Sequence, residues 1–206
     1  MKKYSYPRFV DKKNIEKIED IENHRLFKLS VPLNFEGDKS ALIITRSPRI
    51  YNEDGSSHII SKALKYIKTK IHEEFYGISK VEFVFLFPVS EYNEEYLYTI
   101  LDESGEKHFI GNDGFYDDNG SLIKNDDLIF YAMMEADYIV FAWGDMPPEI
   151  NYVGSERVKY ILKGYKMIKN NSDNIKETYN IGYTESGTPK HCLMWRETDN
   201  IYRFEV

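Results

Sequence analysis

Three short apolar runs constrain the fold of this chain more than any other feature of its sequence. Apolar residues are continuous or nearly so over 41–45, 81–88 and 138–142. Runs of this length, without a polar residue at every second position, are typical of strands buried on both faces of a parallel sheet. Between and after these runs, apolar residues recur at helical spacing, over 59–71, 128–136 and 158–168.

Alternating strands and helices, in units of roughly 30–40 residues, predict βαβ connectivity. We therefore expect an α/β fold, a three-layer sandwich with a mainly parallel central sheet flanked by helices. Residues 179–184 are predicted to form the last core strand. Residues 26–33 alternate in polarity and contain Pro32, which favours an edge strand, and 200–206 are expected to add another.

Polar residues mark where the helices begin. Ser56 or Ser57 is expected to cap the first long helix, and Asn125 or Asp126 a later one. A short helix is also expected over 94–101.

A chain of 206 residues has room for one well-buried domain, which we place over 24–206. Residues 1–23 are charged, have no clear period and offer little to bury, so they are predicted to form an N-terminal extension. Residues 105–120 are rich in turn formers and acidic groups, which indicates an excursion from the core.

The composition excludes some classes of function. A net charge of -7 disfavours tight non-specific binding of nucleic acid, although a local basic patch stays compatible with it. The single cysteine, Cys192, rules out an intramolecular disulfide framework and fits a cytoplasmic protein. No secretory signal follows the N-terminus, and no run reaches the ~18 apolar residues of a membrane span. The 17 tyrosines fit a ligand pocket, an interface or a coding bias.

The predicted functional site lies where loops leave the carboxyl ends of the strands, because such loops meet in one crevice. Four loops qualify: 45–52, 87–91, 143–148 and 185–191. Their side chains suit a small polar, partly aromatic molecule such as a nucleotide or a nucleobase. The predicted ligand-binding residues are Arg46, Ser47, Arg49, Asn52, Phe87, Trp143, Gly144 and Thr188.

Two residues of these loops are candidates for catalysis. His191 follows a predicted strand and is a candidate general acid or electrophile, or else a histidine bonded to a neighbouring loop. Asp145 is a candidate for orienting a water or binding a ligand, or else for capping the next helix. Likewise, Trp143 is either a ligand-stacking residue or part of the core. Arg46 and Arg49 either bind a ligand or are solvated loop charges. Cys192 is not expected to pair with His191, because adjacent side chains point apart along an extended chain.

Metal and cofactor motifs fail on inspection. Residues 115–126 have the glycine of a calcium loop, but Phe115 occupies the first ligand position and Asp126 replaces the closing glutamate. The five histidines are scattered, and neither zinc spacing nor a glycine-rich phosphate loop is present. We expect no metal and no cofactor.

Several motifs, in order, resemble a known family. They include Ala41-Leu-Ile-Ile-Thr-Arg-Ser-Pro48 for "L-N-P-S-T", Val84-Phe-Leu-Phe87 for "V-N-L-F", Asn125-Asp126 for "N-D-x-x-L", Ala142-Trp-Gly144 for "A-W-G", and Gly182-Tyr-Thr-Glu-Ser-Gly-Thr-Pro-Lys-His-Cys-Leu193 for "G-x-T-x-x-G-x-P-x-H-P-L". From about His24 to Trp195 the chain therefore resembles the bacterial and phage family called domain of unknown function 1643. The last two motifs are the specific ones. The chain departs from the family at Arg46-Ser-Pro-Arg49, at Phe85 and at Cys192.

The family pattern is in turn similar to uracil-DNA glycosylases, α/β proteins with a polar turn after the first core strand and a His-Pro-Ser turn after the last. That similarity implies that the loop 45–52 faces an activated water and that His191 faces a base carbonyl. Fold analogy alone does not assign a function.

Three functions are thus left open. The first is binding of a small polar ligand at the sheet edge. The second is hydrolysis of a glycosidic bond, which requires an accessible His191 with Asp145 or Asn52 within reach of one water. The third is a non-catalytic interaction module or homo-oligomer, which a large exposed aromatic patch away from the crevice would favour.

Overall fold

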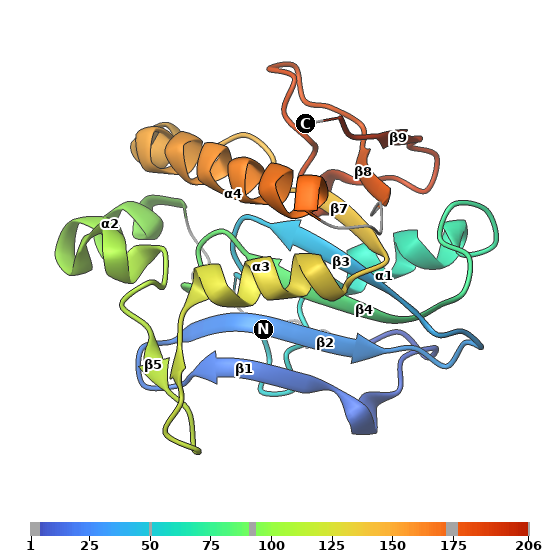
Figure 1. The fold of residues 1–206 in the computed structure, drawn as a ribbon, viewed down its shortest axis with the longest axis horizontal. Helices are drawn as coiled ribbons and strands as arrows, with labels where there is room; N and C mark the ends of the chain where they lie inside the picture. The colour runs from blue at the N-terminus through green and yellow to red at the C-terminus, as the bar shows by residue number, and fades with distance from the viewer. Residues whose placement is uncertain (1–4, 50, 91–93, 172–176, 206) are drawn as a thin grey trace.

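The computed structural model describes residues 5–49, 51–90, 94–171 and 177–205, and its centre is a seven-stranded sheet (Figure 1). The spatial order of the strands is β1 (Glu16–Asp20), β2 (Arg25–Pro32), β4 (Ile78–Phe85), β3 (Lys39–Thr45), β7 (Tyr138–Ala142), β8 (Glu177–Ile181) and β9 (Ile201–Arg203). The chain is therefore a mixed α/β protein, as its sequence predicts. Two short strands, β5 (Phe115–Tyr116) and β6 (Leu122–Ile123), pair separately.

Apolar residues on both faces of the sheet are covered by helices. Ile43 of β3 belongs to a core cluster with α1 (His58–Lys70), whereas its neighbours Leu42 and Ile44 belong to a second cluster on the opposite face. That second cluster includes α2 (Glu94–Phe109), α3 (Asn125–Glu135) and α4 (Asn151–Asn171), and α3 and α4 lie side by side over the sheet (Figure 1). The continuous apolar run of β3 thus serves two cores at once.

The sheet is mixed as a whole and parallel only at its centre. Strands β4, β3, β7 and β8 run parallel, but the β1–β2, β2–β4 and β8–β9 pairings are antiparallel. The prediction of a mainly parallel sheet therefore holds for the central strands only. The turn between β1 and β2 is too short for a parallel crossover, so these two strands must be antiparallel.

The N-terminal segment is part of the sheet, in contrast to the predicted extension. Tyr6 and Val10 are only 3% and 4% exposed, and the Tyr6 hydroxyl donates to the carbonyl of Asp54 at 2.9 Å. Strand β1 pairs with β2 and becomes the edge, so the edge position expected for 26–33 is wrong. Isolated apolar residues with distant partners leave no periodic signal, which is why the sequence hides this packing.

The helix boundaries agree with the sequence at α1 and differ at α2 and α3. Ser57 caps α1 by accepting a hydrogen bond from the Ile60 N–H at 3.2 Å. Helix α2 runs well past residue 101, with a kink at Gly105, where φ is 80°. Asn125 is not the cap of α3: its buried Nδ2 donates instead to the carbonyls of Phe85 and Ile110, both at 2.9 Å. It therefore joins the end of β4 to the end of α2.

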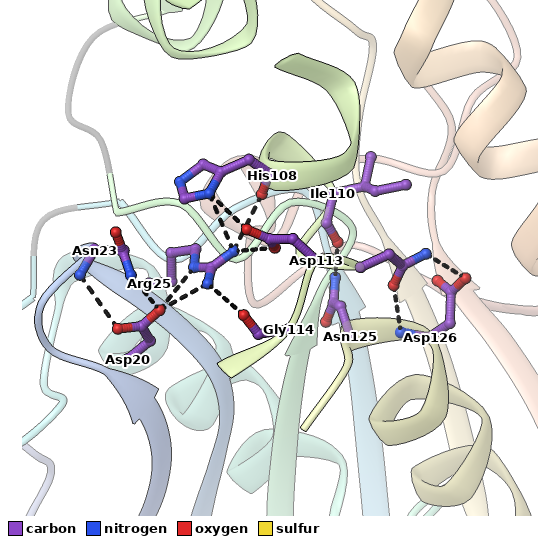
Figure 2. Close-up of polar contacts among 10 residues, drawn as sticks. Asp20, Asn23, Arg25, His108, Ile110, Asp113, Gly114, Asn125 and Asp126 are labelled. Atoms are coloured by element: carbon purple, nitrogen blue, oxygen red, sulfur yellow. Dashed lines mark hydrogen bonds and ion pairs between the residues drawn. The ribbon is translucent and has the colours of Figure 1, made fainter. Parts of the chain in front are cut away.

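The excursion after α2 is held to the sheet by a buried arginine (Figure 2). Arg25 is 1% exposed, and its Nε and Nη2 donate to Oδ2 of Asp20 at 3.1 and 2.7 Å. Nη1 of Arg25 donates to Asp113, and Nη2 donates to the carbonyl of Gly114 at 3.0 Å. Burial alone would raise the pKa of Asp20, but hydrogen bonds from Arg25 and Asn23 outweigh it and hold that pKa below its usual value. This ion-pair network fastens residues 113–114 to β1 and β2.

Arg25→Ala should lower the free energy of unfolding by about 3–5 kcal/mol, because it leaves a buried carboxylate at Asp20 without its cation. Urea denaturation measures the change. The control is Arg203→Ala, whose exposed guanidinium lies 3.9 Å from Glu177 and whose loss should cost no more than about 0.5 kcal/mol. Equal effects of the two substitutions would contradict the role assigned to Arg25.

Candidate functional site

Loops from three central strands meet at the carboxyl edge of the sheet. Nη1 of Arg46, just after β3, donates to the carbonyl of Asp145, just after β7, at 2.6 Å. The Gly144 N–H donates to the carbonyl of Pro189, in the loop after β8, at 3.0 Å. The convergence expected from the parallel centre of the sheet is therefore present.

His191 is held between β3 and its own loop. It is 8% exposed, its Nδ1 accepts a hydrogen bond from the Leu193 N–H at 3.1 Å, and its Nε2 lies 3.2 Å from Oγ1 of Thr45. Oγ1 of Thr45 donates to the carbonyl of Ala142 at 3.1 Å. Since the Thr45 proton points to Ala142, the network assigns the imidazole proton to Nε2, which donates to Thr45.

The environment of His191 keeps the imidazole neutral. Burial, followed by the positive charges of Arg46 and Arg49, lowers the pKa of His191 to about 3. A neutral imidazole whose N–H is already bonded to Thr45 is not a general acid near neutral pH. In this arrangement His191 ties the last loop to β3.

The low pKa of His191 makes stability depend on pH. Its pKa is near 6.5 in an unfolded chain, so below pH 6.5 the unfolded state binds a proton that the folded state excludes. Stability from this group is complete above pH 6.5 and falls as the pH drops towards 3. Between pH 7 and pH 5 the wild type should lose about 2 kcal/mol more than His191→Gln. Urea melts at the two pH values check this, and parallel losses would contradict it.

Gly144 is required because the chain passes very close to His191. Its φ is +70°, and a Cβ at this position would lie 2.8 Å from Cβ of His191. A side chain here meets both backbone strain and overlap with the buried histidine. The family-like sequence Ala142-Trp-Gly144 therefore has a packing reason in this structure.

Gly144→Ala should destabilise the protein by about 2–4 kcal/mol, of which strain accounts for about 1–2 and overlap for the rest. Gly187→Ala is the matched control, because Gly187 also has positive φ (82°) but has open space around the position of a Cβ. A smaller loss is expected for Gly187→Ala in thermal or urea denaturation. Equal losses would show that the contact with His191 carries no energy.

Asp145 stands in an open groove beside His191's loop. Its Oδ1 accepts hydrogen bonds from Thr184 at 2.8 Å and from Ser186. The hydrogen bond from Ser186, helped by those from Thr184 and Thr188, outweighs the opposing effect of burial and lowers the pKa of Asp145, so the exposed carboxylate stays ionised. The groove has a volume of about 570 Å³.

The other wall of this groove, which we call the Asp145 groove, is the first half of α4. Asn151, Ser155 and Lys159 recur every fourth residue and line it, and the Ser155 hydroxyl donates to Oδ1 of Asn151 at 3.3 Å. Helix α4 comes close because Gly154 faces Met146, whose side chain would lie 2.6 Å from a Cβ. These α4 residues and Thr184 lie outside the four predicted loops, whereas Ser186 lies in the predicted loop 185–191 but is not among the predicted ligand-binding residues. The i, i+4, i+8 polar spacing was the available signal, but such a stripe is usually a solvated face.

Most of the predicted residues lie around one sheet edge, but Asn52 and Phe87 do not. Trp143, Gly144, Asp145 and Thr188 line the Asp145 groove. The positive charges of Arg46 and Arg49 lower the pKa of His191, and Ser47, between them in the sequence, is buried.

Asn52 lines a different hollow, and its side chain donates to Oγ of Ser56 at 2.8 Å within its own loop. Phe87 is fully buried against Phe109, with ring centroids 4.4 Å apart. Trp143 is 1% exposed and packs against Phe141, so only a small part of its indole reaches the groove. Ile50 and Glu91, within two of the predicted loops, lie outside the described residues.

Among the residues that the structure describes, no three His, Cys, Asp or Glu side chains are grouped as metal ligands. Over the same residues, no helix has the length and apolar character needed to cross a membrane.

A comparison of the chain with protein-family models, curated proteins and solved structures finds no match. The resemblance to domain of unknown function 1643, and through it to uracil-DNA glycosylases, therefore stays a prediction from the sequence motifs.

Proposed function

We propose that the protein binds a small polar ligand that carries hydroxyl groups, of the nucleoside or nucleotide class, in the Asp145 groove. The observation that carries this proposal is an ionised, solvent-accessible carboxylate fixed at the end of β7 in an open groove. A carboxylate is a pure hydrogen-bond acceptor, so it selects ligands that offer donors. The neighbouring hydroxyls of Ser186 and Thr188 add groups that can both donate and accept.

The size and charges of the groove favour this ligand class. Its volume of about 570 Å³ lies within the range of roughly 300–1,000 Å³ for small-molecule sites. The vicinal hydroxyls of a ribose are a good match for Asp145, as in other sites where a carboxylate binds ribose. Lys159, on the α4 wall, now pairs with Glu156 at 2.7 Å, and this exposed ion pair can give way to a ligand phosphate. The net charge of -7 disfavours a long nucleic acid as the ligand.

A glycosidic-bond hydrolase, with a glycosylase-like three-layer sandwich fold, is less well supported by the site. That reaction needs an accessible His191, but His191 is buried and its Nε2 is bonded to Thr45. Asn52 lines a separate hollow, which leaves Asp145 as the residue that could orient a water in this groove. A neutral imidazole is still compatible with an electrophilic role, provided that the loop after β8 opens.

Thermal-shift and calorimetric titrations with the four ribonucleoside 5′-monophosphates test the proposal, with the 2′-deoxy compounds in parallel. We expect at least one ribonucleotide to bind and its 2′-deoxy form to bind more weakly, because a charged hydrogen bond is lost. Asp145→Asn should weaken binding about tenfold or more, which corresponds to the roughly 1.5–3 kcal/mol of such a bond.

The matched control is Asp118→Asn, an exposed aspartate in the β5–β6 turn, which should leave binding unchanged. If no ribonucleotide binds, the nucleotide class is overturned. Binding that survives Asp145→Asn would instead move the site away from this groove.

A further inference from the structure

The outer surface of α3 and α4 presents several large apolar side chains to solvent. Four large side chains stand out on it: Tyr131, Met134, Tyr160 and Met167, which are 55%, 48%, 50% and 59% exposed. Between the two helices runs an open groove of about 410 Å³, lined mainly by Phe130, Met134, Tyr160, Met167 and Ile168. We call this surface the α3–α4 face. Apolar surface gathered in one groove is a mark of an interaction site.

One close contact sets the axial register of α3 against α4. The ring of Phe130 lies over Gly164, where a Cβ would come within 2.2 Å of it. Helix α3 leads into β7 and α4 follows it, so both run antiparallel to β7 and parallel to each other (Figure 1). With a rise of about 1.5 Å per residue, Asp127 then lies near the level of Lys163, and Glu135 lies at the level of α4's last turns.

The two rims of the groove carry opposite charges. Asp127 and Glu135 are exposed on α3, and Lys163 and Lys166 are exposed on α4. A peptide of one charge sign would be attracted by one rim and repelled by the other. A second copy of the chain avoids this conflict, because its acidic α3 rim can face the basic α4 rim of the first copy, and its basic rim the acidic one.

We infer that the α3–α4 face joins two copies of this chain about a twofold axis that runs along the groove. About such an axis, α3 of one copy packs parallel to α4 of the other. Because a rotation does not change positions along its axis, residues at the same axial level face each other. Asp127 of each copy then meets Lys163 of the other, and Glu135 meets Lys166. Met134 and Met167, adaptable apolar side chains, fill the centre. The contact is isologous and closes as a dimer.

The first test is the mass of the protein in solution over a range of concentrations, by sedimentation velocity and light scattering. The wild type should sediment as a dimer, and Met134→Lys should raise the dimer dissociation constant about tenfold or more. Met194→Lys is the matched control, because Met194 is 62% exposed on a different element, the turn Cys192–Met194. A wild type that is monomeric at every concentration overturns the proposal. A dimer that Met134→Lys leaves intact also overturns it, since another face would then form the contact.

A charge-exchange experiment tests the pairing itself. Asp127→Lys and Lys163→Glu should each weaken the dimer, because both contacts then bring like charges together. Mixing the two variants restores both contacts in the mixed dimer, so the mixture should associate more tightly than either variant alone. A mixture no tighter than its components would overturn the proposed axis. This readout distinguishes lost pairing from lost folding, because each variant is rescued by the other.

Discussion

Every residue of β3 from Ala41 to Thr45 is fully buried, and β7 beside it is almost as completely shielded from water. Each side chain of these strands must therefore find a partner inside the protein, on whichever face of the sheet it points to. On one face the partner is α1, and on the other it is α3 and α4. Where the strands end, the same requirement applies to polar groups. The hydroxyl of Thr45 is satisfied by the carbonyl of Ala142 and the imidazole of His191, and this binds three strands' loops into one edge.

Two different chemical environments lie next to each other at this edge of the sheet. His191 is excluded from water beside two arginines and is kept neutral, whereas Asp145 is exposed and is kept charged by the hydroxyls around it. The desolvated histidine acts on structure, because a neutral N–H bonded to a buried hydroxyl holds a loop in place. The hydrated carboxylate is the group that a ligand can reach. Two residues proposed together from the sequence thus have different physical roles.

The predictable part of the fold is the part encoded locally. Strand β7 has the bounds that its apolar run predicts, and Ser57 caps α1 because its hydroxyl is next to the N–H groups that it serves. Tyr6 and Val10 could not be placed, because their partners are remote in sequence. The prediction that Asn125 caps a helix is wrong for a related reason: its amide donates instead to the carbonyls of Phe85, Leu86 and Ile110, which are distant in sequence. At the site, Asp145 was found because it follows a core strand. Its hydroxyl partners, Thr184 and Ser186, and the α4 wall could not be predicted, because they are brought together only when two loops and a helix pack.

The two edge strands of the sheet, β1 and β9, affect how readily the protein aggregates. Strand β1 reads Glu-Lys-Ile-Glu-Asp and so has charges at four of its five positions, and β9 has only three residues, ending in Arg203. Short or highly charged border strands are poor templates for another strand, because a newcomer would find few backbone partners or a row of charges to desolvate. Growth of the sheet from chain to chain, the usual route from a β-rich protein to aggregates, is therefore blocked at both ends. The dimer that we infer at the α3–α4 face uses helical surfaces instead, where association can stop at a defined size.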